Sequence, residues 1–300
     1  MSHALTVNLS ESYPPPWRLL RALVSSTPRA ELFSALFLLG CANGLAARVG
    51  RSITEHDGWL VAVLATFKIS IIIFGACFAG VSLFFRERLA AFGRTEDTVR
   101  TSDFAVAAFF VMLVLLPISP LSWLAVTMLS LYILLFTNTQ EAGRRGATIL
   151  LATSVPMLWS PLTFDFFAKI VLEREASVIG WLLSTHQSGN MVEFADHSAN
   201  LVILPGCSSL ANVSLAFLCW VTLSQFVAHK RRARDVLWCL LICASVVAIN
   251  VTRVALMGLN ISFYNAIHNA IGDTIANAIV FSLTVGISVL GLRREVFSRA

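Results

Sequence analysis

The chain has 300 residues, of which 57% are hydrophobic and only 13% are charged, and its mean hydropathy is +0.76. Soluble domains are about half apolar and a quarter charged, so these values exclude an ordinary soluble protein and indicate an integral membrane protein. The net charge of +5 lies in short loops between apolar runs, a pattern that reports membrane topology and gives no reason to expect a nucleic-acid partner.

Apolar runs long enough to cross a hydrocarbon core of roughly 30 Å recur along the chain. They follow a polar tail, residues 1–30, that lacks the apolar core of a cleavable signal peptide. We therefore expect an all-α polytopic protein with about eight transmembrane helices in one domain covering residues 1–300. The expected spans are 31–49, 58–85, 104–116, 121–136, a fifth starting at 147, 208–227, 236–258 and 274–292.

Two features interrupt this series before the sixth span. Pro156 and Pro161 predict a kink or an end in the fifth span. Residues 164–206 then mix apolar and charged side chains, as an amphipathic interfacial helix would. Within this segment, residues 190–194 and 199–203 flank a polar turn, so we expect a small hairpin outside the membrane that leads into the sixth span.

Lysine and arginine residues predict the orientation. Most of the 22 Lys and Arg residues lie in the N-terminal tail, in the loops 86–103, 137–146 and 229–235, and in the C-terminal tail. Positively charged loops stay in the cytoplasm, so both termini should be cytoplasmic in a bacterial or archaeal inner membrane. The segment 164–206 and the catalytic region proposed below, within 207–292, should then face the periplasm or cell exterior.

The strongest local signal is the sequence LVILPGCSSLAN, residues 201–212. Pro205 and Gly206 interrupt the apolar run, and Ser208 or Ser209 can cap a new helix, so Cys207 should lie at a helix N-terminus. That position favours a thiolate and offers backbone N–H groups to an oxyanion. The alternative is that Cys207 is simply a small buried hydrophobe, as cysteine usually is.

Two further residues fall on the same expected outer side. Arg253 lies near the outer end of the seventh span, one helical turn after Asn250, whose amide could orient the guanidinium. His268 lies in the short loop before the eighth span. Taken singly, Arg253 could extend to the interface and His268 could be an ordinary hydrogen-bonding residue. Together with Cys207 they supply a nucleophile, a base and an oxyanion stabiliser.

The other cysteines and the lysine inside the second span give weaker indications of function. The other five cysteines lie inside apolar runs, where neither disulfides nor zinc sites are expected, and we expect no metal or cofactor. Lys68, inside the second span, could pair with Asp165 or Glu173 or line a substrate groove.

These residues resemble the exosortase/archaeosortase family of membrane cysteine transpeptidases. The resemblance is carried by Pro205-Gly206-Cys207-Ser208-Ser209-Leu210, Asn250-Val251-Thr252-Arg253 and His268-Asn269-Ala270-Ile271-Gly272, in family order; Ser209 replaces the glycine of the family's usual CSG motif. The resemblance implies catalysis by Cys207, Arg253 and His268, supported by Asn250, Ser208 and Ser209. The implied partners are exported proteins with a C-terminal sorting signal of the PEP-CTERM kind, which combines a short motif, a transmembrane helix and a basic tail, together with membrane lipids and an acceptor nucleophile.

Two other functions remain open from the sequence. The chain could be a transporter that binds an anionic solute through Lys68 and Arg253, although no paired half-spans or internal repeats are present. It could also be a scaffold that binds exported helices without cutting them. Only the enzyme requires Cys207 to be reactive while the other cysteines are inert.

Overall fold

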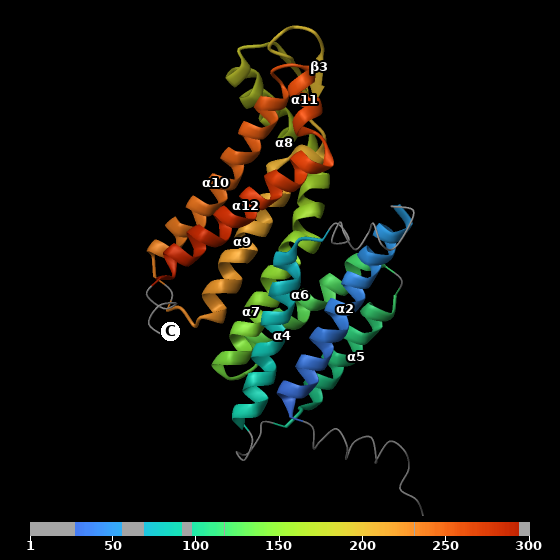
Figure 1. The fold of residues 1–300 in the computed structure, drawn as a ribbon. Coiled ribbons are helices and arrows are strands. Elements are labelled where there is room, and N and C mark those ends of the chain that lie inside the picture. Colours follow the sequence, from blue (N-terminus) through green and yellow to red (C-terminus); the bar gives the residue numbers. More distant parts are fainter. Residues whose placement is uncertain (1–27, 56–68, 92–97, 117, 231, 294–300) are drawn as a thin grey trace, which may run out of the picture.

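The computed structural model describes residues 28–55, 69–91, 98–116, 118–230 and 232–293 (Figure 1). The chain is about 81% helical, with only a few residues in strands. The helices are α2 (Arg29–Glu55), α4 (Ile71–Ala91), α5 (Thr101–Leu115), α6 (Ser119–Phe136), α7 (Glu141–Ser154), α8 (Ser160–Leu183), α9 (Ser209–Phe226), α10 (Arg234–Met257), α11 (Ile261–Ile267) and α12 (Ala270–Gly291).

Within the described residues, five helical segments are long and apolar enough to cross a membrane, which agrees with the expected polytopic architecture. They are Arg29–Thr54, Glu141–Leu183, Ser209–Phe226, Arg234–Met257 and Ile271–Gly291. Three shorter apolar helices correspond to the expected second, third and fourth spans; they include Ile71–Arg86, Thr101–Leu115 and Pro120–Phe136. The first half of the expected second span, with Lys68, lies outside the described residues.

The fifth span is longer than the sequence pattern indicates. α7 passes through a π-helical turn, Val155–Trp159, directly into α8, so one helical segment of 43 residues results. At 1.5 Å per residue it is about 65 Å long. Pro156 lies inside the π-helical turn, and Pro161 lies directly after it, in the first turn of α8. The prolines therefore change the helical hydrogen-bond pattern and do not end the helix.

Three buried clusters hold the helices together. The first joins α2, α4, α5, α6 and α7 around large side chains such as Phe37, Phe84 and Trp123. The second joins α9, α10 and α12 around Trp220 and Ile242. The third, which we call the outer core, lies where α8, α11 and strand β3 come together at one end of the molecule (Figure 1). Its buried members are Leu172, Ala176, Ile179, Val192, Phe194, Leu201, Ile203 and Val254. The outer core positions the candidate site described below.

Close packing of α4 against α7 depends on glycine. A Cβ atom on Gly146 would lie 2.7 Å from the Gly80 carbonyl oxygen, and one on Gly80 would lie 2.7 Å from Leu150. Both positions therefore exclude any larger side chain unless the two helices separate.

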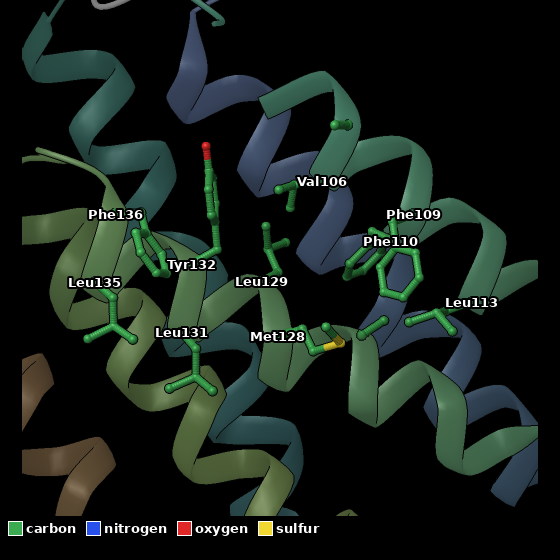
Figure 2. A pocket seen from close by; sticks show the side chains of 12 residues that line it. Val106, Phe109, Phe110, Leu113, Met128, Leu129, Leu131, Tyr132, Leu135 and Phe136 are labelled. Carbon is green, nitrogen blue, oxygen red and sulfur yellow. The ribbon is translucent and has the colours of Figure 1, made fainter. Parts of the chain in front are cut away.

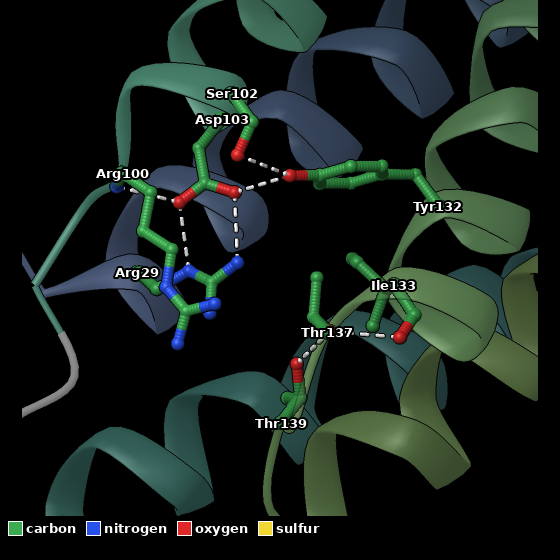
Figure 3. A network of polar contacts seen from close by, with 8 residues as sticks. All are labelled: Arg29, Arg100, Ser102, Asp103, Tyr132, Ile133, Thr137 and Thr139. Carbon is green, nitrogen blue, oxygen red and sulfur yellow. Dashed lines mark hydrogen bonds and ion pairs between the residues drawn. The ribbon is translucent and has the colours of Figure 1, made fainter.

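A buried ion pair joins α2 to α5 at the opposite end from the outer core. Arg29 donates from Nε and Nη2 to the two carboxylate oxygens of Asp103, at 2.7 and 2.8 Å, and the Tyr132 hydroxyl donates to Asp103 at 2.7 Å (Figure 3). The Asp103 and Arg29 side chains are only 0% and 5% exposed. Burial of two charges is tolerated because each carboxylate oxygen has several donors.

The expected hairpin is present between α8 and α9. Strands β1 (Gln187–Ser188), β2 (Met191–Glu193) and β3 (Asn200–Val202) form an antiparallel sheet in the order β1-β2-β3, with Val192 opposite Leu201. Both of these residues are buried in the outer core. The Ala195 N–H donates to the Gly258 carbonyl oxygen at 2.9 Å, which ties the sheet to the end of α10.

Candidate functional site

Cys207 lies directly before a helix, as its sequence context predicts. Pro205–Cys207 forms a single 3-10 turn, and Ser208 is the N-cap of α9. Proline suits the first position of such a turn, and the serine hydroxyl accepts from the Leu210 N–H at 3.3 Å. The thiol is half-buried, because Cys207 packs against the outer core.

The backbone N–H groups around Cys207 are not available to an oxyanion, contrary to expectation. The amides of residues 207–210 each donate a hydrogen bond, in order to Leu204 O (2.9 Å), Pro205 O (3.2 Å), Glu175 Oε1 (2.8 Å) and Ser208 Oγ (3.3 Å). A helix N-terminus binds anions through unsatisfied N–H groups. Any oxyanion formed at Cys207 therefore needs a different donor.

Asn250 holds Cys207 and does not hold Arg253. Its buried Nδ2 donates to the Cys207 carbonyl oxygen at 2.6 Å and to Ser209 Oγ at 3.1 Å. Within the described residues no hydrogen bond joins Asn250 to Arg253, so the expected orientation of the guanidinium by this amide is wrong. A guanidinium offers only donors, so that contact would need Asn250 Oδ1 as its acceptor, whereas the structure engages the amide through Nδ2, with acceptors at the start of α9, which packs against α10.

Arg253 pairs with an acidic residue of α12. Its Nη2 donates to Asp273 Oδ1, and the two side chains are 20% and 51% exposed. The Arg253 Nε is buried and has no acceptor among the described residues. A guanidinium donates through five N–H groups, so Arg253 keeps a donor for another ligand while it is paired.

His268 lies at the break between α11 and α12. It is the C-cap of α11, and Asn269 caps α12 by accepting from the N–H groups of Ile271 and Gly272 at 3.0 and 2.8 Å. Gly272 is required here, because a Cβ atom would overlap the carbonyl oxygen of Ile267. The exposed His268 ring lies 5.0 Å from the Tyr264 ring, centroid to centroid.

The structure places the three predicted residues at one end of the molecule but does not bring them into contact. Cys207 and Tyr264 both pack against the outer core, and Val254, next to Arg253, is part of it. Within the described residues, neither His268 nor Arg253 makes a hydrogen bond to Cys207. Cys207, Arg253 and His268 therefore lie on separate elements: before α9, on α10 and at the break between α11 and α12.

A groove of about 470 Å³ runs between α10, α11 and α12 and has Arg253 in its wall. Its other walls are mostly apolar, with Ile249, Ile275 and Ile279 prominent. The groove begins next to the candidate site and continues along the membrane-spanning part of α12. It therefore forms a mostly apolar path along α12 to Arg253.

The other grooves and polar side-chain clusters of the described residues offer fewer groups that could take part in a reaction. Figure 2 shows a groove of about 530 Å³ between α5 and α6, lined by apolar side chains and by Tyr132. Among the described residues, no three His, Cys, Asp or Glu side chains form a group able to hold a metal ion. In the outer hairpin, a hydrogen bond from the Ser198 hydroxyl, together with one from its N–H, lowers the pKa of the exposed Asp196 carboxyl.

The other five cysteines differ from Cys207 in position. All of them lie within helices: Cys41, Cys77, Cys219, Cys239 and Cys243. Cys41, Cys77 and Cys219 are buried. Of the six thiols, Cys207 alone precedes a helix and packs against the outer core, whereas the others lie within helices.

Two residues of the site were missed by the sequence interpretation. Glu175 reaches α9 from α8, and Asp273 reaches Arg253 from α12. Asp273 lies only five residues after His268 in a mostly apolar stretch, and this was a usable signal. Glu175 has no such signal, because other charged residues surround it in the sequence.

Comparison of the chain with family models, with curated proteins and with solved structures finds no match.

Proposed function

We propose that the protein is a membrane cysteine peptidase or transpeptidase of the exosortase kind, which cleaves C-terminal sorting signals of exported proteins at the outer membrane face. The observation that carries the proposal is the position of Cys207. It is a half-buried thiol in front of α9, held by its carbonyl oxygen, at the same end of the molecule as an arginine with a donor to spare and an exposed histidine.

The reaction assigns one role to each residue. Cys207 Sγ attacks the scissile carbonyl carbon while His268 takes the thiol proton. The C–S bond forms, the C–N bond breaks, and His268 gives the proton to the leaving amine. Transfer of the thioester to an acceptor amine, or to water, then releases the client protein and frees Cys207.

Arg253 is the proposed oxyanion donor. The N–H groups of residues 207–210 are all occupied by other acceptors, whereas the guanidinium of Arg253 lies in the wall of the groove and, among the described residues, gives one hydrogen bond, to Asp273. A fixed donor in a water-poor site stabilises a tetrahedral intermediate by several kcal/mol. Asp273 keeps the guanidinium in place and limits its motion.

His268 has to approach Cys207 for the first step. Catalytic hydrogen bonds are often absent before substrate binds, and His268 lies in a chain break between two helices, where small backbone rotations move a side chain most easily. Binding of the client peptide between α9 and the α11–α12 break supplies the closure in this proposal.

The proposed topology follows from the same assignment. Eight spans with both termini in the cytoplasm put the outer hairpin and the α11–α12 break on the periplasmic side. Arg29, Arg86, Arg145 and Arg232 then lie at the cytoplasmic ends of their helices or in a cytoplasmic loop. The alternative of anion transport gains no support, because Lys68, the second residue that it needs, lies outside the described residues.

Processing of a co-expressed client tests the proposal. The client should carry a C-terminal motif, a transmembrane helix and a basic tail, and its size should be followed on a gel. Cys207→Ala, Arg253→Ala and His268→Ala should leave the client full length. Cys219→Ala, which removes a buried thiol of α9, should process it normally. Processing by Cys207→Ala at equal membrane abundance would show that the thiol is structural.

A further inference from the structure

Glu175 occupies the N-terminus of the helix that follows Cys207. From α8, its Oε1 accepts from the Ser209 N–H at 2.8 Å and from the Ser208 hydroxyl at 3.2 Å. Both serines are buried. The second oxygen, Oε2, is also buried and has no hydrogen-bond partner among the described residues.

These contacts differ from those of a solvent-exposed carboxylate on a protein surface. A carboxylate next to a helix N-terminus is favoured by the helix dipole and by charge-assisted hydrogen bonds. Burying an oxygen without a partner opposes that gain. One carboxylate oxygen of Glu175 is therefore well bonded, while the other is buried at a cost, which indicates that this position serves more than the stability of α8.

Glu175 and Asn250 hold the cysteine loop from two sides. Asn250 binds the Cys207 carbonyl oxygen from α10, and Glu175 binds the next two residues from α8. Both contacts act on backbone or serine atoms and leave the sulfur untouched. Pro205 and Gly206, on the other side of the thiol, are exposed, so these two contacts, together with the packing of Cys207 against the outer core, set the position of the thiol.

We propose that Glu175 is a positioning residue for Cys207: its carboxylate fixes the first turn of α9 and thereby directs the thiol toward the scissile bond. This proposal rests on the proposed peptidase function. It assigns Glu175 no proton transfer and no contact with substrate.

The test uses the full-length protein in membranes and two readouts. The first is the rate at which N-ethylmaleimide modifies Cys207, measured on the peptide that contains it; the second is client processing per molecule of folded protein. The variants are Glu175→Ala, Glu175→Gln and Glu175→Asp, and the matched control is Glu173→Ala, which removes a half-buried glutamate from the same helix.

Glu175→Ala should change the maleimide rate several-fold and reduce processing roughly tenfold or more, the effect of about 1.4 kcal/mol. Glu175→Gln retains an oxygen acceptor for the Ser209 N–H, so it should restore both readouts to within about threefold of wild type. Glu175→Asp is too short to reach α9 with unchanged backbones and should resemble alanine, and Glu173→Ala should resemble wild type.

Three results would overturn the proposal. One is a Glu175→Ala protein with wild-type values of both readouts. Another is a Glu175→Gln protein that loses processing as fully as alanine while the maleimide rate stays normal, since the carboxylate would then act chemically. The third, if alanine does not fold, is an aspartate variant with wild-type values. If wild type processes no client, the maleimide rates still decide the positioning role and the peptidase proposal fails separately.

Discussion

Removing the Asn250 amide should weaken the hold on Cys207 without disturbing Arg253. Asn250→Leu keeps most of the side-chain volume but loses two hydrogen bonds from a residue that is only 5% exposed. Each such bond contributes about 0.5–1.5 kcal/mol net, so the loss is about 1–3 kcal/mol. If that energy holds the thiol in place, the processing rate falls roughly 5- to 150-fold.

The assay is the client-processing rate per folded molecule, combined with a double-mutant cycle. Asn250→Leu with Ser209→Ala should show a coupling energy of about 0.5–1 kcal/mol, because the two side chains are bonded. Asn250→Leu with Asp273→Asn should be additive. Asn212→Leu, which changes a half-buried asparagine on α9, is the matched control. The reasoning is refuted if Asn250 couples to Asp273 and not to Ser209, since the amide would then act through Arg253.

Three further changes test other parts of the structure. Asp103→Ala removes the carboxylate that binds the buried Arg29 guanidinium and should cost about 3–5 kcal/mol of unfolding free energy in detergent, whereas replacing both residues by apolar ones should cost much less; equal losses would contradict a buried ion pair. Gly272→Ala should displace the α11–α12 break and abolish processing with little loss of membrane abundance; normal processing would show that the break tolerates a side chain. Asp273→Asn should lower processing several-fold by loosening Arg253, and an unchanged rate would leave the ion pair without a role in the reaction.

The sequence predicts the local structure around Cys207 well. Pro205 and Gly206 stop the preceding strand, and Ser208 caps α9, so the thiol had to precede a helix. The hairpin before it is visible as two apolar segments around a polar turn. These features depend on neighbours within a few residues, and such contacts leave a direct trace in the sequence.

Contacts between residues that are far apart in the sequence are harder to predict from it. Asn250 and Arg253 share a helix face, but the amide is bound by α9, and only the packing of α9 on α10 decides between these partners. Glu175 lies 34 residues before Ser209, and its role depends on α8 continuing from α7 through the π-helical turn. The prolines predict a kink or an end in that helix, and the π-helical turn that accommodates Pro156 has no clear sequence signature.

A covalent intermediate on Cys207 is the most direct test of the central claim. The wild-type protein should be co-expressed with a client protein, quenched in acid, purified, and analysed by intact and peptide-level mass spectrometry before and after hydroxylamine, beside His268→Ala, which should form no thioester. The account predicts a client acyl group on Cys207 that hydroxylamine removes, and its absence from Cys207→Ala. Processing of the client with no adduct on Cys207 in any variant, or processing by Cys207→Ala, would contradict it.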